Sequence, residues 1–236
     1  MPPLPQPLAS VFAQGAERVP KRERTRRQLM QAAIQVFSAR GVQGASIQEI
    51  ATVAGMANGT VYNHFATKDD IVQAVAVALA ETLCLQIDES YEHVKDGAER
   101  MCIGMRRYLW LARESPQWAL LLLGVSAATP ALSDHVRQYS LADLRLGIKQ
   151  KRFRVASEES GLDVVFGTNT LAMTKVAMGL VPKPEDYCAA VVSNVLCGLG
   201  VSQQEAAELV RRPLPPFPVP GAEQPAAGPK PPTRKA

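Results

Sequence analysis

The sequence predicts an all-α protein in which an N-terminal three-helix domain is joined by a long helix to a larger helical domain. Apolar residues recur at helical spacing through most of the 236 residues. Ser, Thr or Asp caps, or a proline in the first turn, precede most of these apolar stripes. The hydrophobic fraction of 47% is sufficient for a globular core.

The two ends of the chain differ in composition from its middle. Residues 1–21 are rich in Pro, Gln and Ala, and they predict a disordered basic arm. Nine of the 18 prolines fall in residues 213–236, which predicts a proline-rich disordered tail. Between these ends we expect one domain over residues 22–67 and a second over residues 68–212.

The first helix is expected over Arg22–Arg40, followed by Gly41, which can take the left-handed conformation that closes a helix. Its apolar stripe consists of Leu29, Ala33, Val36 and Phe37. Arg24 and Arg27 lie near its start, where cations oppose the positive end of the helix dipole. Nearby phosphates would account for this placement, and an ordinary solvated helix end is the alternative.

The second helix starts with a capping box, because the Ser46 hydroxyl can cap a free amide while the Glu49 carboxylate reaches back. Gly55 ends this helix, and a third helix is expected over Met56–Phe65. The inward faces of the two helices are formed by Ile47, Ile50, Ala51, Ala54, Val61 and Phe65. Two short helices around a glycine turn are the outline of a helix-turn-helix DNA-binding motif.

The later helices follow from similar start signals. Residues 67–70 form a second capping signature, which begins a long helix reaching about Val94. The remaining predicted elements are helices over 96–114, from Pro116, over 130–154, over 162–180, over Tyr187–Leu199 and after Ser202, with a polar break over 157–161.

The charge distribution points to a polyanionic partner for the N-terminal domain. Residues 1–68 hold eight basic and three acidic residues, a net charge of +5. The rest of the chain holds 18 basic and 19 acidic residues, a net charge of −1. A basic domain on a near-neutral body favours binding to nucleic acid by the first domain alone.

Several classes of protein find little support in the sequence. The four cysteines form no C-x-x-C pair and predict reduced, packed thiols, with no metal site. No G-x-S-x-G, phosphate-binding glycine loop or H-E-x-x-H occurs, so we expect neither enzyme activity nor a cofactor. The longest apolar run, residues 118–125, falls short of the about 20 residues that span a bilayer. Since no signal segment is visible either, we expect a soluble, cytoplasmic protein without a membrane partner.

The third helix and the residues after it carry a family resemblance. The run Asn58–Lys68, NGTVYNHFATK, resembles the signature of the tetracycline-repressor (TetR) family of bacterial transcription regulators. Together with the preceding capping box and glycine turn, the resemblance covers about residues 22–75. It implies a homodimer whose two DNA-binding heads lie about 34 Å apart on a palindromic operator.

The side chains of this run suit contact with double-stranded DNA. Gly59 would let the helix backbone approach closely, and short polar groups such as Thr60 suit base edges. The Lys68 charge and the free amides beside it can meet a phosphate. With the family's contacts carried over, the predicted DNA-binding residues are Arg24, Arg27, Ser46, Gln48, Ala57, Asn58, Gly59, Thr60, Tyr62, Asn63, His64 and Lys68.

Two departures from the family pattern and three structural alternatives accompany this prediction. Ala57 stands where many family members have Ser or Thr, and Asn58 often corresponds to a basic residue. His64 could simply cap the turn, Tyr62 could belong to the core, and Gln48 could be solvated surface.

The resemblance also implies an effector site and a dimer interface in residues 68–212. Soft and aromatic side chains suggest a cavity there, lined by Met101, Met105, Tyr108, Trp118, Phe166 and Met173. For any one of these residues the alternative is ordinary core. Small residues interleaved with Val and Leu in the last two long helices predict close packing across a two-fold axis. The predicted interface residues are Val165, Asn169, Val176, Val191 and Val195.

The sequence therefore predicts a homodimeric repressor that a small hydrophobic effector releases from DNA. The effector would tilt the long helix after Lys68 and separate the two heads, as a shift between existing states. One rival is an activator or effector-independent DNA-binding protein. The other is a helical ligand-binding protein with a vestigial head.

Overall fold

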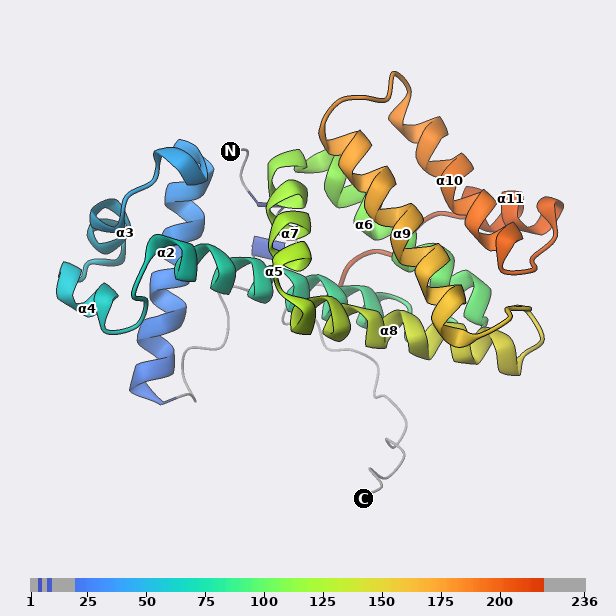
Figure 1. Ribbon diagram of the computed structural model, residues 1–236, viewed down its shortest axis with the longest axis horizontal. Helices are drawn as coiled ribbons and strands as arrows, with labels where there is room; N and C mark the ends of the chain where they lie inside the picture. Colours follow the sequence, from blue (N-terminus) through green and yellow to red (C-terminus); the bar gives the residue numbers. More distant parts are fainter. Residues whose placement is uncertain (1–3, 6–7, 10–19, 219–236) are drawn as a thin grey trace.

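The computed structural model describes residues 4–5, 8–9 and 20–218, and within these ranges the regular structure is entirely helical (Figure 1). The head contains α2 (Lys21–Gly44), α3 (Ile47–Ala54) and α4 (Asn58–Tyr62). The body contains α6 (Gly97–Glu114), α7 (Pro116–Ala128), α8 (Pro130–Lys149), α9 (Glu158–Ala177), α10 (Pro184–Gly198) and α11 (Gln203–Arg211). The predicted all-α fold is confirmed.

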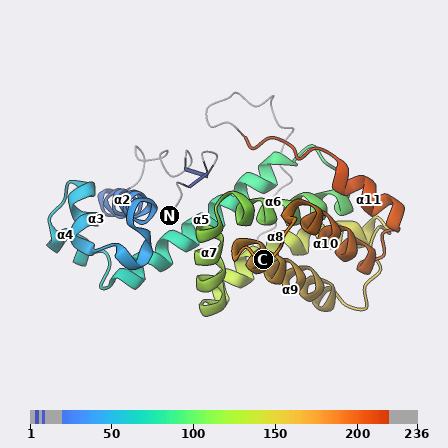
Figure 2. The same ribbon diagram turned by 90° about the horizontal axis from the view of Figure 1, so that it is seen from above.

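A single helix, α5 (Lys68–Ser90), connects the head and the body. The head lies at one end of the molecule in both views, and α5 runs from it into the body (Figures 1 and 2). Length and composition alone would let α5 cross a membrane, but most of it is buried against α2, α7 and α8. It is therefore the central core helix of the fold.

The first helix of the head agrees closely with its prediction. The stripe residues Leu29, Ala33, Val36 and Phe37 are all buried. Gly41 leaves helical geometry, with a φ of 74° and a ψ of 163°, and the chain kinks there before one last turn ends at Gly44. Only glycine adopts such a backbone without strain.

The helix-turn-helix forms as predicted, but its second helix is shorter. Ser46 and Glu49 make both hydrogen bonds of the capping box, and Gly55 ends α3 in the left-handed conformation, with a φ of 66°. The backbone of Ala57 is extended, so α4 begins at Asn58. Its end is tightened where the amide of His64 donates to the carbonyl of Val61 at 2.9 Å. The prediction of a helix over Met56–Phe65 was thus too long at both ends.

The connecting helix starts as predicted and ends earlier. Thr67 and Asp70 form its capping box. At the other end Tyr91 leaves helical geometry, and its buried hydroxyl donates to Asp143 Oδ2 at 2.9 Å. This bond fixes the end of α5 to α8, so the helix stops at Ser90 and not near Val94.

The body helices differ from their predictions mainly at the ends. α8 stops at Lys149 because the amides of Arg152 and Phe153 turn back to the carbonyl of Gly147. The Phe153 ring lies against Gly147, where a Cβ would come within 2.2 Å of it. The predicted polar break over 157–161 is instead the capped start of α9, and α10 starts at Pro184, three residues before Tyr187.

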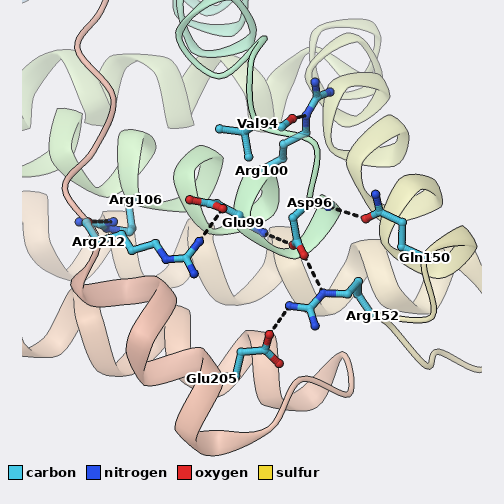
Figure 3. A network of polar contacts seen from close by, with 10 residues as sticks. Val94, Asp96, Glu99, Arg100, Arg106, Gln150, Arg152, Glu205 and Arg212 are labelled. Carbon is cyan, nitrogen blue, oxygen red and sulfur yellow. Dashed lines mark hydrogen bonds and ion pairs between the residues drawn. The ribbon is translucent and has the colours of Figure 1, made fainter.

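A polar network fastens the far end of the body (Figure 3). Arg152 pairs with Asp96 at 2.8 Å and with Glu205 at 2.5 Å. Glu99 pairs with Arg212 at 2.6 Å. These contacts join the start of α6 to α11 and to the segment between α8 and α9.

Both terminal segments contain residues that pack, contrary to the prediction of a disordered arm and tail. Leu4 and Leu8 are buried. After α11 the chain returns to α6, where the Arg107 guanidinium lies 3.8 Å from the centre of the Phe217 ring and donates to the carbonyl of Pro215. The other residues of the predicted arm up to residue 19, and those of the tail from residue 219, lie outside the described ranges.

Candidate nucleic-acid interface and body cavity

One surface of the head, formed by α3, α4 and the turn between them, presents most of the residues predicted to bind DNA. Gln48, Ala57, Asn58, Gly59, Tyr62 and Asn63 are exposed there, while Thr60 and His64 are half-buried. Tyr62 is 57% exposed, so it does not belong to the core. The buried side chains of Val61 and Phe65 hold this segment to the head.

The backbone at Gly59 is accessible from outside. A Cβ built on Gly59 meets no atom within 4 Å, and the residue has ordinary helical geometry. Neither packing nor backbone conformation in the head therefore requires a glycine at this position. A side chain there would project only toward something outside the chain.

Two of the predicted contacts are already used inside the head. The Ser46 hydroxyl caps α3, accepting from the Glu49 amide at 3.2 Å, and the Glu49 pKa is lowered by its hydrogen bonds with Ser46. The Lys68 ammonium donates to the carbonyls of Val42, Gln43 and Ala45 at 3.1, 3.4 and 3.2 Å. Lys68 thus closes the C-terminal end of α2.

The described part of the head, residues 20–68, is basic, with seven Lys or Arg residues and two Glu residues. Arg24 is exposed, and Arg27 is paired with Glu23 at 3.0 Å. Arg26, which the sequence did not single out, lies 4.9 Å from the centre of the Phe65 ring. This cation–π contact joins the start of α2 to the segment after α4.

The body contains a cavity of about 110 Å³ that is lined by residues of α5, α6, α7, α8 and α9 and is partly open to solvent. Five of the six residues predicted to line an effector site lie in its wall: Met101, Met105, Tyr108, Phe166 and Met173. Trp118 does not, because its side chain is fully buried in the packed core.

The wall of the cavity also contains polar groups that the sequence reasoning missed. Asp143 accepts a hydrogen bond from Tyr91 and lies 3.8 Å from Arg100, and burial raises the pKa of its carboxyl to about 6. The Cys84 thiol lies 3.1 Å from the Tyr108 hydroxyl, and burial raises the pKa of the Cys84 thiol to about 11. The signal in the sequence that could have identified Asp143 is an acidic residue within the apolar stripe of α8.

Most of the residues predicted to form the dimer interface are buried within the protomer. Val165, Asn169, Val176 and Val195 are buried within the protomer, and Val191 is half-buried. The apolar side chains left exposed on α9 and just after it are Val164, Leu171, Met178 and Leu180. Sequence periodicity thus identified the apolar faces of these helices, and those faces form the protomer's own core.

Two family models match this chain in the head and in the body. The model described as bacterial regulatory proteins, tetR family, matches residues 29–75. The model described as tetracyclin repressor-like, C-terminal domain, matches residues 96–212.

Similar proteins include regulators from several bacteria. The HTH-type transcriptional regulator SrpR of Pseudomonas putida is 38% identical over 78 residues, 30% of this chain and 37% of SrpR. The HTH-type transcriptional activator FasR of Mycolicibacterium smegmatis is 26% identical over 147 residues, 62% of this chain and 64% of FasR. The matches thus span less than two thirds of either relative.

Among solved structures, RolR in complex with resorcinol superposes with a TM-score of 0.70 at 28% identity, covering 84% of this chain and 98% of RolR. The same protein without ligand superposes with a TM-score of 0.67. With a helix-turn-helix head, a helical body and a family model matching each of them, the chain belongs to the tetR family of bacterial DNA-binding transcription regulators.

Proposed function

We propose that this chain is a homodimeric transcription regulator that binds a palindromic operator and is released from it by a small molecule in the body cavity. The observation that carries the DNA-binding part is the exposed surface around α4. It combines short polar side chains, an unobstructed backbone at Gly59 and a basic head.

The proposed mode of DNA binding places α4 in the major groove. Asn58, Thr60 and Asn63 would contact base edges, and the open backbone at Gly59 lets the helix approach them closely. The remaining predicted contacts, Arg24, Arg27, Ser46, Gln48, Ala57, Tyr62, His64 and Lys68, would position the head on the phosphates. For Lys68 this role falls to the backbone amide, because its side chain is engaged within the head. The Ser46 amide and hydroxyl both donate to the Glu49 carboxylate, so a phosphate would have to replace that carboxylate to bind Ser46.

The proposed dimer interface is the exposed side of α9 and α10. Leu171, Met178 and Leu180 present a large apolar surface that a second copy would cover. On α10 the neighbouring exposed residues are small or polar, among them Ala190, Asn194 and Gly198, which permits close approach of helices. A two-fold axis here would set the spacing of the two heads on DNA.

We propose the cavity as the effector site, because α5 connects it to the DNA-binding head. Its start lies in the head, and Cys84 and Ile87 near its end line the cavity. Gln73 on the same helix donates to Thr129 at the junction of α7 and α8 at 3.3 Å. RolR, whose fold is similar, was solved in complex with resorcinol, which supports a small-molecule ligand for a protein of this fold. An effector would act by preferring the state in which the heads no longer fit the operator.

We propose that DNA binding by this chain represses transcription. FasR carries the name of an activator, so activation is the second candidate. Transcription of a reporter behind the bound DNA, with and without the regulator, decides between them.

The DNA-binding surface is tested by Gly59→Ala, with Gly124→Ala as the matched control. Both glycines are helical and exposed, and a Cβ at either meets no atom within 4 Å. Each change should leave the free energy of unfolding within about 1 kcal/mol of the native value. DNA fragments selected from a genomic library serve as ligands, with affinity measured by fluorescence anisotropy at several salt concentrations.

We expect Gly59→Ala to weaken binding about tenfold or more, while Gly124→Ala binds as the native protein does. Affinity should fall steeply with salt, because phosphate contacts release counterions. Native-like binding by Gly59→Ala, or affinity that ignores salt, would count against the proposal and favour the vestigial-head alternative.

A further inference from the structure

The body cavity contains an acceptor atom that no group in the described chain satisfies. Asn169 on α9 lines the cavity and is 8% exposed. Its Oδ1 is buried and has no hydrogen-bond partner. Among the described residues that line the cavity, it is the only buried side-chain polar atom without a partner.

The other buried polar side chains of the wall are already paired, while the hydroxyls of Ser126, Ser133 and Ser140 lie on half-buried residues. The Tyr91 hydroxyl donates to Asp143, and Arg100 balances the charge of that carboxylate at 3.8 Å. The Tyr108 hydroxyl and the Cys84 thiol share a hydrogen bond. Among the buried atoms of the wall, a ligand would therefore find an unmet partner at Asn169 Oδ1, and an acceptor gains from a ligand that brings an N–H or O–H group.

The wall also argues against an anionic ligand. Among the described residues that line the cavity there is no Lys, Arg or His, and Asp143 contributes a carboxylate. Burying a ligand carboxylate or phosphate there would leave its charge without a cation. A volume of about 110 Å³ suits a molecule of roughly one aromatic ring, since a designed apolar cavity of about 150 Å³ holds benzene.

We propose that the cavity binds a neutral, ring-sized molecule carrying an O–H or N–H donor, and that Asn169 is the residue that selects for this donor. The proposal rests on the effector role proposed for the cavity and adds the chemical class of the ligand. Apolar contact with Met105, Phe166 and Met173 holds the ring, while the donor reaches Asn169 Oδ1.

The test is calorimetric titration of the full chain, without DNA, with five one-ring probes: phenol, aniline, anisole, toluene and benzoate. Phenol and anisole form the critical pair, because methylation of the oxygen removes the donor and leaves the ring. Asn169→Leu removes the acceptor at similar volume. Leu162→Met, a change of a buried residue on the same helix but outside the cavity wall, is the control.

We expect phenol and aniline to bind the native protein and Leu162→Met about tenfold more tightly than anisole and toluene, with benzoate weakest. In Asn169→Leu the preference for a donor should vanish. Equal affinity for phenol and anisole in the native protein, retained discrimination in Asn169→Leu, or binding of none of the neutral probes would overturn the proposal. The native comparison needs no variant, so it decides the matter even if Asn169→Leu folds poorly.

DNA binding is measured separately on the same preparations. Salt-dependent DNA binding without donor selectivity in the cavity would refute this inference and leave the DNA-binding proposal standing. Donor selectivity through Asn169 without any DNA binding would refute the DNA-binding proposal and leave this inference standing.

Discussion

Individual residues divide into those whose environment the sequence predicts and those whose partners lie far along the chain. The exposure of Asn58, Gly59 and Asn63 follows from local helical periodicity around buried Val61. The role of Lys68 does not, because its three carbonyl partners lie 23 to 26 residues earlier in the chain. A lysine at the start of a helix looks like a phosphate ligand until the packing of α5 on α2 is known.

Replacing Lys68 with methionine tests this structural role. The change keeps an apolar stem and removes three charge-assisted hydrogen bonds, so the free energy of unfolding should fall by about 1–2 kcal/mol. Urea unfolding monitored by circular dichroism measures it, with the exposed Lys183→Met as control. Unchanged stability together with weakened DNA binding would instead assign the Lys68 ammonium to a phosphate.

Helix starts are where the sequence predicts most, and helix ends are where it predicts least. Capping boxes at Ser46 and Thr67, and Pro116 at a first turn, place helix starts because these signals act within a few residues. Helix ends depend on contacts across the fold, such as Phe153 on Gly147, and so several were wrong by a few residues. The face of α9 that meets the protomer's core is decided by α6, α7 and α10, which periodicity alone does not place.

The exposed side of α9 can be tested with a single charge. Leu171 is 60% exposed, and Leu171→Glu would place a carboxylate in the proposed interface, where it would lack a partner. We expect light scattering at micromolar concentration to show mainly monomer, and affinity for a palindromic site to fall at least tenfold. Leu85→Glu, on the exposed side of α5, should remain dimeric. A dimeric Leu171→Glu protein would move the interface elsewhere.

The whole molecule is held together partly by segments that composition alone assigned to disorder. Proline-rich sequence lacks internal hydrogen bonds, and so it predicts an extended chain. An extended chain can still pack when a complementary surface exists, and Arg107 and Trp110 on α6 supply one for Phe217. Neither side of this contact signals the other in the sequence, which is why the docked segment after α11 was missed.

Two truncations separate this docked segment from the residues beyond it. A chain ending at Arg212 loses the burial of Leu214 and Phe217 and the cation–π contact of Arg107, and should be less stable by about 2–3 kcal/mol. A chain ending at Pro218 should unfold at the same midpoint urea concentration as the native protein. If both truncated chains match the native protein, the contacts of Phe217 contribute little to stability.

The connecting helix also acts as a lever arm. At about 1.5 Å per residue, the 23 residues of α5 span about 34 Å between the cavity and the head. A rotation of only about 5° about its cavity end therefore displaces Lys68 by about 3 Å, close to the rise of one base pair. Two such displacements in opposite directions would put a pair of heads out of register with successive grooves. A rotation of α5 this small is thus enough to change the fit of the proposed dimer to DNA.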